Sequence, residues 1–436
     1  MVEYPRVLIS GQYFHTRSGS GITLSNLFSG WDKDKIAATA SYIANPSFDI
    51  CDNYYQIGLK EIIIRFPFNL KVRSNLPSSG KVLHGAQSLS QTILPKTERT
   101  FLRRIYDNFL FSSGLIHYRS TFRISPELLC WIRSFNPEII YSQLSSLEEI
   151  RIVTALHKEL KVPLVIHIMD DWPKTIGRRY FPRVLWSKII KKEFLYLFSS
   201  ATALLSISET MSEEYYKRYR LKFIPFHNPI NIEKWLPYSK VNWENEGDFR
   251  ILYSGRIGRA NGKAIIFMAH IINELNLGGG KVILDIYTPD YDNKDAISIN
   301  DLSGINVKKT VDYKEMPMLL ASYDLLFLPL DFDRDGIRFA KLSMPTKTSE
   351  YMISGTPILI YSPEETAVAK FFGANNCGYR VVHQSEVELK DAIQFLVSNK
   401  DYRQTISSNA VKLAKEKFDD KKVRMKFRRV LLTATT

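Results

Sequence analysis

Cations and glycines follow a short apolar run in the second half of the chain. Residues 254–263 read SGRIGRANGK and carry Arg256, Arg259 and Lys263 just after a predicted strand at 250–254. Ligands bind at the carboxyl ends of parallel strands, and fixed cations there would neutralise the charge of a departing diphosphate. The pattern therefore favours a phosphate-binding loop, with ordinary surface arginines as the alternative.

A second group of polar residues precedes a predicted strand at 357–361. Residues 343–357, SMPTKTSEYMISGTP, predict a helix over 346–354 that proline and threonine open and Gly355 closes. Free amides at the helix start near Thr346 would attract a phosphate. Lys347 would reach the same phosphate, and Glu350, one turn further, would reach a ribose diol. Alternatively, Glu350 is a first-turn acid that complements the helix dipole.

A glycine-rich loop, residues 11–23, follows the first predicted strand. Gly19 and Gly21 would let backbone amides approach a phosphate or sugar where a helix begins near Ile22. The dinucleotide fingerprint GxGxxG requires a third glycine at position 24, where Leu24 stands, so a dinucleotide site is not favoured. A plain flexible turn is the alternative.

These segments resemble the GT-B retaining glycosyltransferases, particularly glycosyltransferase family 4 and its relatives in bacterial surface polysaccharide assembly. The motifs are YSGRIG, VDYKEMPMLLASYDLLFLPL and KTSEYMISGTPILIYSP, with VLISGQYF, the GSG loop and VPLVIHIMDDWP matching more loosely in the first half. The resemblance implies that Arg256 and Lys263 hold the donor diphosphate and that Glu350 holds the ribose. It also implies retention of anomeric configuration without a metal or other cofactor.

One departure from the family pattern concerns the sugar-contacting carboxylate. The family places a glutamate eight positions before the ribose-binding one, and Leu342 stands there in this chain. Asp331, Asp333 or Asp335 would supply a carboxylate instead, or backbone groups would hold the sugar. Residues 331–336, DFDRDG, begin like a calcium-binding loop, but its twelfth position is Leu342 rather than a glutamate, so no metal site is expected.

A second departure concerns the acceptor side. Family members often end the matching first-half strand, here 164–169, in a His-Asp pair, whereas Met169 precedes Asp170 and His167 lies two residues earlier. His167, Asp170 and Asp171 are therefore acceptor-side candidates, with no general base assigned. A strand histidine is also common as a hydrogen-bonded core residue.

Short apolar runs alternate with helical patterns along the chain, which predicts parallel sheets with crossover helices. Strands are predicted at 6–10, 61–66, 138–142, 164–169, 203–207 and 223–226, and then at 250–254, 282–287, 306–311, 325–329, 357–361 and 378–382. Helices are predicted in the second half at 263–276, 313–322, 346–354, 365–372, 386–398 and within 401–432. The fold class is α/β, with two tandem Rossmann-like doubly wound parallel-sheet domains and a ligand cleft between them.

The expected domains follow from where this alternation breaks. They are an acceptor-side domain over 1–228, a linker over 229–248, a nucleotide-sugar-binding domain over 249–414 and a C-terminal helix over 415–436 that packs back on the first domain. Residues 68–100 lack periodicity and read as an insertion. Three scattered cysteines indicate neither a disulfide framework nor a zinc site, and a cytoplasmic protein without a signal peptide or membrane span is expected.

The net charge of +14 is unevenly distributed. Residues 60–135 hold twelve Lys or Arg and four acids, and residues 174–192 hold seven basic residues and no acid, interleaved with aromatic and aliphatic ones. This mixture favours contact with anionic membrane headgroups or lipid-linked phosphate. A solvated basic face is one alternative; nucleic-acid binding is another, but it does not explain two sheets with ligand clefts.

The sequence thus predicts a glycosyltransferase that moves a sugar from a nucleoside-diphosphate sugar to a glycan acceptor on a lipid carrier. The enzyme would be peripheral on the inner face of the plasma membrane, with no nucleic-acid partner. A non-catalytic homologue that binds sugar nucleotide or polysaccharide is an alternative and would retain Arg256 and Glu350 without turnover. A nucleotide-sugar epimerase is another and would act without an acceptor.

Overall fold

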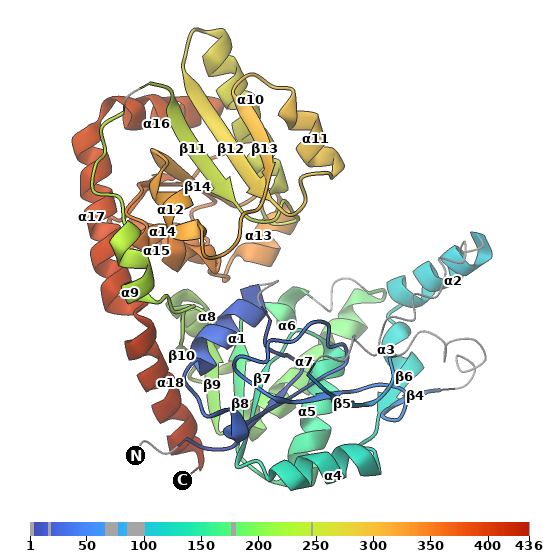
Figure 1. Ribbon diagram of the computed structural model, residues 1–436. Helices are drawn as coiled ribbons and strands as arrows, with labels where there is room; N and C mark the ends of the chain where they lie inside the picture. Colours follow the sequence, from blue (N-terminus) through green and yellow to red (C-terminus); the bar gives the residue numbers. More distant parts are fainter. Residues whose placement is uncertain are drawn as a thin grey trace. The chain divides into compact units, whose positions relative to one another are not determined.

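The computed structural model describes residues 4–15, 19–65, 77–84, 101–175, 180–245 and 247–435 (Figure 1). The chain divides into two compact units. Unit 1 comprises Met1–Phe226 with Arg424–Thr436, and unit 2 comprises His227–Val423. Most of the expected insertion at 68–100 lies outside the described residues. Each unit is built around its own parallel sheet, so the predicted α/β class with two Rossmann-like sheets is confirmed.

The main sheet of unit 1 has the strand order β10-β9-β8-β7-β1-β2-β3-β5. The strands are β1 (Val7–Ser10), β2 (Ile36–Ala40), β3 (Asn53–Gln56), β5 (Gly80–Val82), β7 (Ile139–Gln143), β8 (Leu164–Ile168), β9 (Ala203–Ser206) and β10 (Ile224–Pro225). Only the β3–β5 pair is antiparallel among the described strands of this sheet. The predicted strand at 61–66 forms β4 (Ile62–Ile64), which pairs with β6 (Ser120–Phe122) in a separate two-stranded sheet.

The helices of unit 1 are α1 (Gly19–Phe28), α2 (Phe101–Ser112), α3 (Ile116–Arg119), α4 (Pro126–Phe135), α5 (Leu147–Leu160), α6 (Trp172–Thr175), α7 (Arg183–Ser200) and α8 (Glu209–Tyr219). Three of them begin in the same way. Ser125, Ser146 and Ser208 precede α4, α5 and α8, and each hydroxyl accepts a hydrogen bond from a backbone amide of the first turn. Such caps fix where these helices begin.

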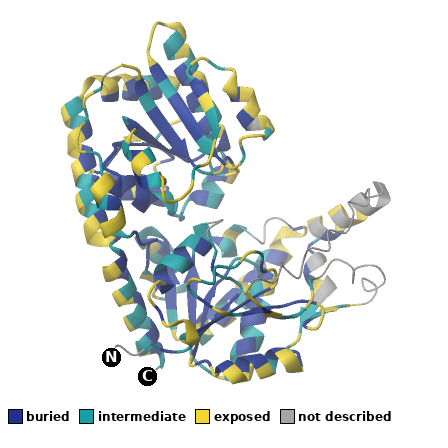
Figure 2. Ribbon diagram, in the orientation of Figure 1, coloured by how far each residue is buried: buried dark blue, intermediate teal, exposed yellow. Residues whose placement is uncertain are grey.

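The sheet of unit 2 has the order β13-β12-β11-β14-β15-β16, and all of its pairs are parallel. The strands are β11 (Phe249–Ser254), β12 (Val282–Thr288), β13 (Ile305–Lys309), β14 (Leu325–Pro329), β15 (Ile358–Tyr361) and β16 (Tyr379–Val381). Every residue of β14 and β15 is buried, as expected for strands covered on both faces (Figure 2). This 3-2-1-4-5-6 order is that of a doubly wound Rossmann sheet, whose ligands bind beyond the carboxyl ends of the strands.

The helices of unit 2 are α9 (Ile232–Trp235), α10 (Gly262–Leu277), α11 (Lys294–Asn300), α12 (Met316–Ala321), α13 (Arg334–Ala340), α14 (Lys347–Ile353), α15 (Ala367–Asn375), α16 (Glu386–Ser398) and α17 (Lys400–Lys417). A further helix, α18 (Asp420–Thr435), begins in unit 2 and continues in unit 1. Within unit 1 its Phe427 ring lies 5.2 Å from Phe28 and 5.5 Å from Tyr141, between ring centroids. No helix among the described residues combines the length and apolar character needed to cross a bilayer.

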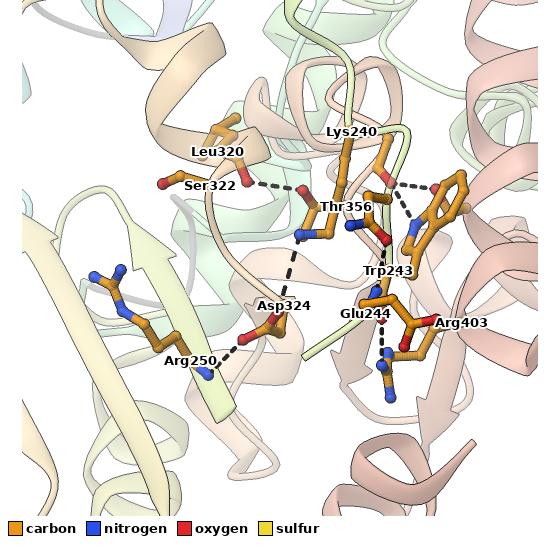
Figure 3. Close-up of polar contacts among 12 residues, drawn as sticks. Lys240, Trp243, Glu244, Arg250, Leu320, Ser322, Asp324, Thr356 and Arg403 are labelled. Atoms are coloured by element: carbon orange, nitrogen blue, oxygen red, sulfur yellow. Dashed lines mark hydrogen bonds and ion pairs between the residues drawn. The ribbon is translucent and has the colours of Figure 1, made fainter. Parts of the chain in front are cut away.

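The segment expected to be a linker, 229–248, belongs to unit 2 and contains α9. Its later part is fixed by hydrogen bonds (Figure 3): Trp243 Nε1 donates to the Gly355 carbonyl at 3.2 Å, and Arg403 Nη2 donates to the Trp243 carbonyl at 2.7 Å. The Lys240 amide also donates to the Ser354 carbonyl at 2.8 Å. These bonds hold the segment against the C-terminal end of α14 and against α17.

Candidate functional site

Two buried tyrosines fix the loop that follows β11. The amide of Ser254 donates to the Tyr351 hydroxyl oxygen at 3.0 Å, which joins the end of β11 to α14. The Tyr253 hydroxyl donates to the carbonyl of Arg256 at 2.6 Å and accepts from Asn261 Nδ2, also at 2.6 Å. Polar contacts therefore hold the backbone of the predicted phosphate-binding loop in place. The backbone positions from which the side chains of Arg256 and Arg259 extend are fixed.

Lys347 is the first residue of α14, and its amine points back to the end of β11. Its Nζ atom donates to the Ser254 carbonyl at 2.7 Å and lies 4.1 Å from the centre of the Tyr253 ring. Gly255 has a φ of +139°, and a Cβ atom there would lie 2.4 Å from this Nζ. Burial lowers the pKa of Lys347 to about 7, against the opposing effect of Glu350. An anionic ligand beside this half-buried amine would favour its protonated form.

Glu350 lies one turn along α14 from Lys347 and is 8 % exposed. Burial raises the pKa of its carboxyl to about 7, and a hydrogen bond from Tyr313 and the charge of Lys347 oppose that rise. The Tyr313 ring lies 6.1 Å from the Trp235 ring, between centroids. Tyr313 and Trp235 are site residues that the sequence analysis did not single out, although Tyr313 lies within the motif VDYKEMPMLLASYDLLFLPL, because both come from elements other than α14.

Arg256 and Lys263 are more exposed than Lys347, and each lies close to an aspartate. The side chain of Arg256 is 70 % exposed, with its Nη1 3.9 Å from Asp290 Oδ1. The side chain of Lys263 is equally exposed, and its Nζ lies 2.5 Å from Asp333 Oδ2. Arg259 is exposed on the same loop. The structure therefore places Lys347, rather than Lys263, directly against the end of β11.

The three aspartates suggested for the missing sugar contact all have local contacts. Asp331 is buried and accepts from the Ala264 amide at 2.7 Å, which caps the first turn of α10, and burial raises its pKa. Asp333 caps α13 by accepting from the Gly336 amide at 2.7 Å, and its bond with Lys263 lowers its pKa. Asp335 pairs with Arg338 at 3.2 Å. Leu342, which stands where the family 4 pattern has a sugar-contacting glutamate, is buried.

Thr346 lies next to Lys347 and precedes α14 without capping it through its side chain. Its carbonyl accepts a hydrogen bond from Asn228 Nδ2 at 3.1 Å. This bond ties residue 228, just before the expected linker, to the start of α14 within unit 2.

The acceptor-side candidates of unit 1 have different surroundings. His167 is fully buried in β8, with Nδ1 2.8 Å from the Tyr141 hydroxyl, a geometry typical of a polar core residue. Asp171 is also buried and pairs with Arg218 Nη1 at 2.8 Å, and it accepts from the Tyr215 hydroxyl at 3.1 Å. Asp170, at the carboxyl end of β8, is less buried than either residue.

The glycine-rich loop leads into α1, which begins at Gly19. Gly21 is buried, and a Cβ atom there would lie 2.5 Å from the His15 carbonyl oxygen. Close packing of α1 against residue 15 therefore explains why position 21 holds glycine. Residues 16–18 lie outside the described residues.

No protein-family model matches this sequence, and no curated protein matches it. Solved structures do match. HepE of Anabaena in complex with UDP and glucose has a TM-score of 0.63 and 13 % identity, covering 98 % of this chain and 99 % of that one. Sucrose-phosphate synthase of Thermosynechococcus elongatus has a TM-score of 0.64 and 12 % identity, covering 100 % of both.

A third match is α,α-trehalose 6-phosphate synthase of Burkholderia multivorans, with a TM-score of 0.59, 12 % identity and 100 % of both chains covered. The chain has the GT-B fold. Lys347 and Glu350 lie on α14 in unit 2, and Lys347 contacts the carboxyl end of β11. TM-scores of 0.59–0.64, at identities of 12–13 %, establish a shared fold.

Proposed function

We propose that this protein is a glycosyltransferase that moves a sugar from a nucleoside-diphosphate sugar to a glycan acceptor. The observation that carries the proposal is the placement of the half-buried Lys347 and the buried Glu350, one helical turn apart, where a doubly wound sheet binds its ligand. Structures of the matching HepE contain UDP with glucose, and UDP-glucose. A uridine diphosphate sugar is accordingly the donor to test first.

The proposed roles follow from the positions of the side chains. Lys347 contacts the donor diphosphate from the end of β11, and the exposed Arg256 and Arg259 approach it from the loop. Glu350 accepts hydrogen bonds from the ribose hydroxyls, with Tyr313 orienting its carboxylate. The resemblance to family 4 assigns the diphosphate to Arg256 and Lys263; the contacts of Lys347 favour this lysine over Lys263.

The reaction breaks the bond between the anomeric carbon and the diphosphate oxygen, and the acceptor oxygen forms a bond to the same carbon. Negative charge develops on the departing diphosphate, which takes up the proton of the acceptor hydroxyl. Fixed cations that face this charge stabilise the transition state more than the bound donor. In this proposal Lys347 and Arg256 supply the stabilisation without a metal ion, and configuration is retained.

Two further parts of the proposal concern unit 1. Asp170, as the less buried carboxylate beyond β8, is the acceptor-side candidate that we retain over His167. The acceptor is a glycan on a lipid carrier, because the excess positive charge of the chain falls largely in unit 1 and would attract lipid-linked phosphate. The protein then works on the cytoplasmic face of the membrane.

A donor and acceptor screen tests the proposal. The purified protein is incubated with UDP-, GDP-, dTDP- and CMP-sugars in EDTA, with and without a lipid-linked oligosaccharide fraction, and products are followed by mass spectrometry. We expect acceptor-dependent release of one free nucleotide together with a sugar added to the acceptor, and loss of both in Glu350→Ala. Conversion of the donor sugar without an acceptor would indicate an epimerase, and binding without turnover would indicate a non-catalytic homologue.

A further inference from the structure

Unit 1 carries a group of exposed apolar side chains at α2 and at the start of α7. Phe181 is 75 % exposed, Val184 69 % and Phe109 57 %. The full group, which we name the α2–α7 surface, consists of Ile105, Tyr106, Phe109, Phe181, Val184 and Leu185. Single exposed apolar residues are normal, but a group of large ones marks an interaction site.

Hydrogen bonds join the two parts of this surface. The amide of Phe181 donates to the carbonyl of Ser112, the last residue of α2, at 2.6 Å. Just beyond α2, the carbonyl of Ser113 accepts from Trp186 Nε1 at 2.9 Å. Gly114 follows with a φ of +71°, and a Cβ atom there would lie 2.3 Å from the Trp186 ring. The end of α2 and the start of α7 are therefore held side by side.

The helical geometry of α2 places its exposed apolar residues near the junction with α7. With a rise of about 1.5 Å per residue, Phe109 lies about one turn before the end of α2 and Ile105 about two. Ile105 and Phe109 are four residues apart, so they share a face of the helix. The exposed apolar residues of both helices thus lie within about two turns of their junction.

Basic residues flank the apolar ones on α7. Arg183, Lys188, Lys191 and Lys192 are all exposed. Residues 174–192 contain no acid. Glu193, the next residue, is bonded to Arg151 through both carboxylate oxygens, at 3.0 and 3.1 Å. The α7 side of the surface is therefore apolar and positive together.

We propose that the α2–α7 surface docks unit 1 on a membrane that contains anionic lipid. Aromatic and aliphatic side chains would enter the headgroup boundary, while the lysines of α7 would contact lipid phosphates. Positive charge beside large apolar side chains complements an anionic bilayer, which offers both chemistries at one boundary. The purpose of this docking rests on the proposed function, since it would bring unit 1 to a lipid-linked acceptor, but docking itself needs neither donor nor acceptor.

Co-sedimentation of the full chain with vesicles tests the inference. We expect binding to vesicles of phosphatidylcholine and phosphatidylglycerol in equal parts, little binding to phosphatidylcholine alone, and weakening as salt is raised. The triple change Phe181→Ser, Val184→Ser, Leu185→Ser should reduce binding about tenfold or more. A second triple variant should reduce vesicle binding to a similar extent: Lys188→Gln, Lys191→Gln, Lys192→Gln. Each lysine adds to the electrostatic attraction to anionic lipid.

The matched controls lie in unit 2. One control removes three exposed aliphatic side chains in the triple variant Val241→Ser, Leu277→Ser, Val387→Ser. The other removes three exposed charges in the triple variant Lys281→Gln, Lys294→Gln, Lys314→Gln. Both should leave vesicle binding unchanged. Thermal melting of every variant identifies those that fail to fold, and UDP binding by unit 2 is measured on the same samples.

Several outcomes would overturn the inference. These are equal binding to neutral and mixed vesicles, binding to neither, retained binding in both unit 1 variants, or salt-dependent binding to duplex DNA without vesicle binding. Vesicle binding by a protein that binds no nucleotide would support the docking surface while contradicting the proposed function, so the two failures are distinguishable.

Discussion

The Nζ atom of Lys347 lies 2.7 Å from the carbonyl oxygen of Ser254. This contact joins the start of α14 to the end of β11, and the half-buried amine also lies against the face of the Tyr253 ring. Burial lowers the pKa of this amine to about 7, and the charge of Glu350 only partly opposes that effect. A bound diphosphate would add negative charge beside the amine and would favour its protonated form.

Replacing this amine tests its role. Lys347→Met should weaken UDP binding by about ten- to a hundredfold, since hydrogen bonds to charged groups contribute about 1.5–3 kcal/mol. The melting temperature should fall slightly, because the buried Glu350 loses a neighbouring positive charge that favours its carboxylate. Isothermal titration calorimetry gives the affinity. Lys263→Met, whose exposed amine pairs with Asp333, should change it less than about threefold; an equal loss in both variants would contradict the role of Lys347.

Gly255 should tolerate no side chain. In Gly255→Ala the new methyl group would meet the Lys347 amine, and the φ of +139° would add about 1–3 kcal/mol of backbone strain. We expect lower stability and a UDP affinity reduced about tenfold or more. Gly279→Ala is the matched control, since Gly279 has a φ of +89° and nothing within 4 Å of its Cβ position. It should lose stability and keep its affinity; a normal affinity in Gly255→Ala would show that Lys347 can move freely.

The affinity for the donor should be highest near pH 7 and should fall at both higher and lower pH. Burial lowers the pKa of Lys347 to about 7, so above that pH the amine loses its proton and diphosphate affinity falls. Burial raises the pKa of Glu350 to about 7, so below that pH the carboxylate becomes protonated and ribose affinity falls. Calorimetry with UDP-glucose, whose diphosphate is esterified at both ends, should therefore give a maximum near neutral pH.

Single variants assign the two limbs of this pH profile. Lys347→Met should flatten the alkaline limb, and Glu350→Gln should flatten the acid limb. A profile that is flat in the wild type, or unchanged in either variant, would contradict the assignment.

The neighbouring carboxylates Asp170 and Asp171 should behave differently. Asp171→Asn breaks a buried ion pair with Arg218 and should destabilise unit 1 by about 3 kcal/mol, measured by urea unfolding. Asp170→Asn should cost less stability than Asp171→Asn and should reduce sugar transfer instead. A similar loss of stability in both variants would remove Asp170 as an acceptor-side candidate.

The sequence predicts the sheet of unit 2 better than that of unit 1, for a physical reason. The six strands expected in the second half are all present, because buried parallel strands such as β14, LLFLP, are continuous apolar runs. In unit 1, β2 reads IAATA and β3 reads NYYQ. Small and polar residues give these two strands no distinct pattern, although both are largely buried, so neither was predicted.

The candidate site, like the sheet of unit 1, is only partly predictable from the sequence. Lys347 and Glu350 could be paired from the sequence because both lie on one helix, at a spacing that brings them together. Tyr313 and Trp235 reach the site from separate elements, so only the fold shows their contact. The burial of His167 beside Tyr141 likewise depends on pairing between β7 and β8, which a single strand pattern does not show.

The most direct test of the central claim is the melting temperature of the protein with UDP, GDP, dTDP or CMP at about 100 times the dissociation constant. Binding at that concentration stabilises the folded state by about 2.7 kcal/mol. We expect one nucleoside diphosphate to raise the melting temperature of the wild type and to have little effect on Glu350→Ala and Arg256→Ala. No increase with any of the nucleotides would contradict a nucleotide-sugar site in unit 2.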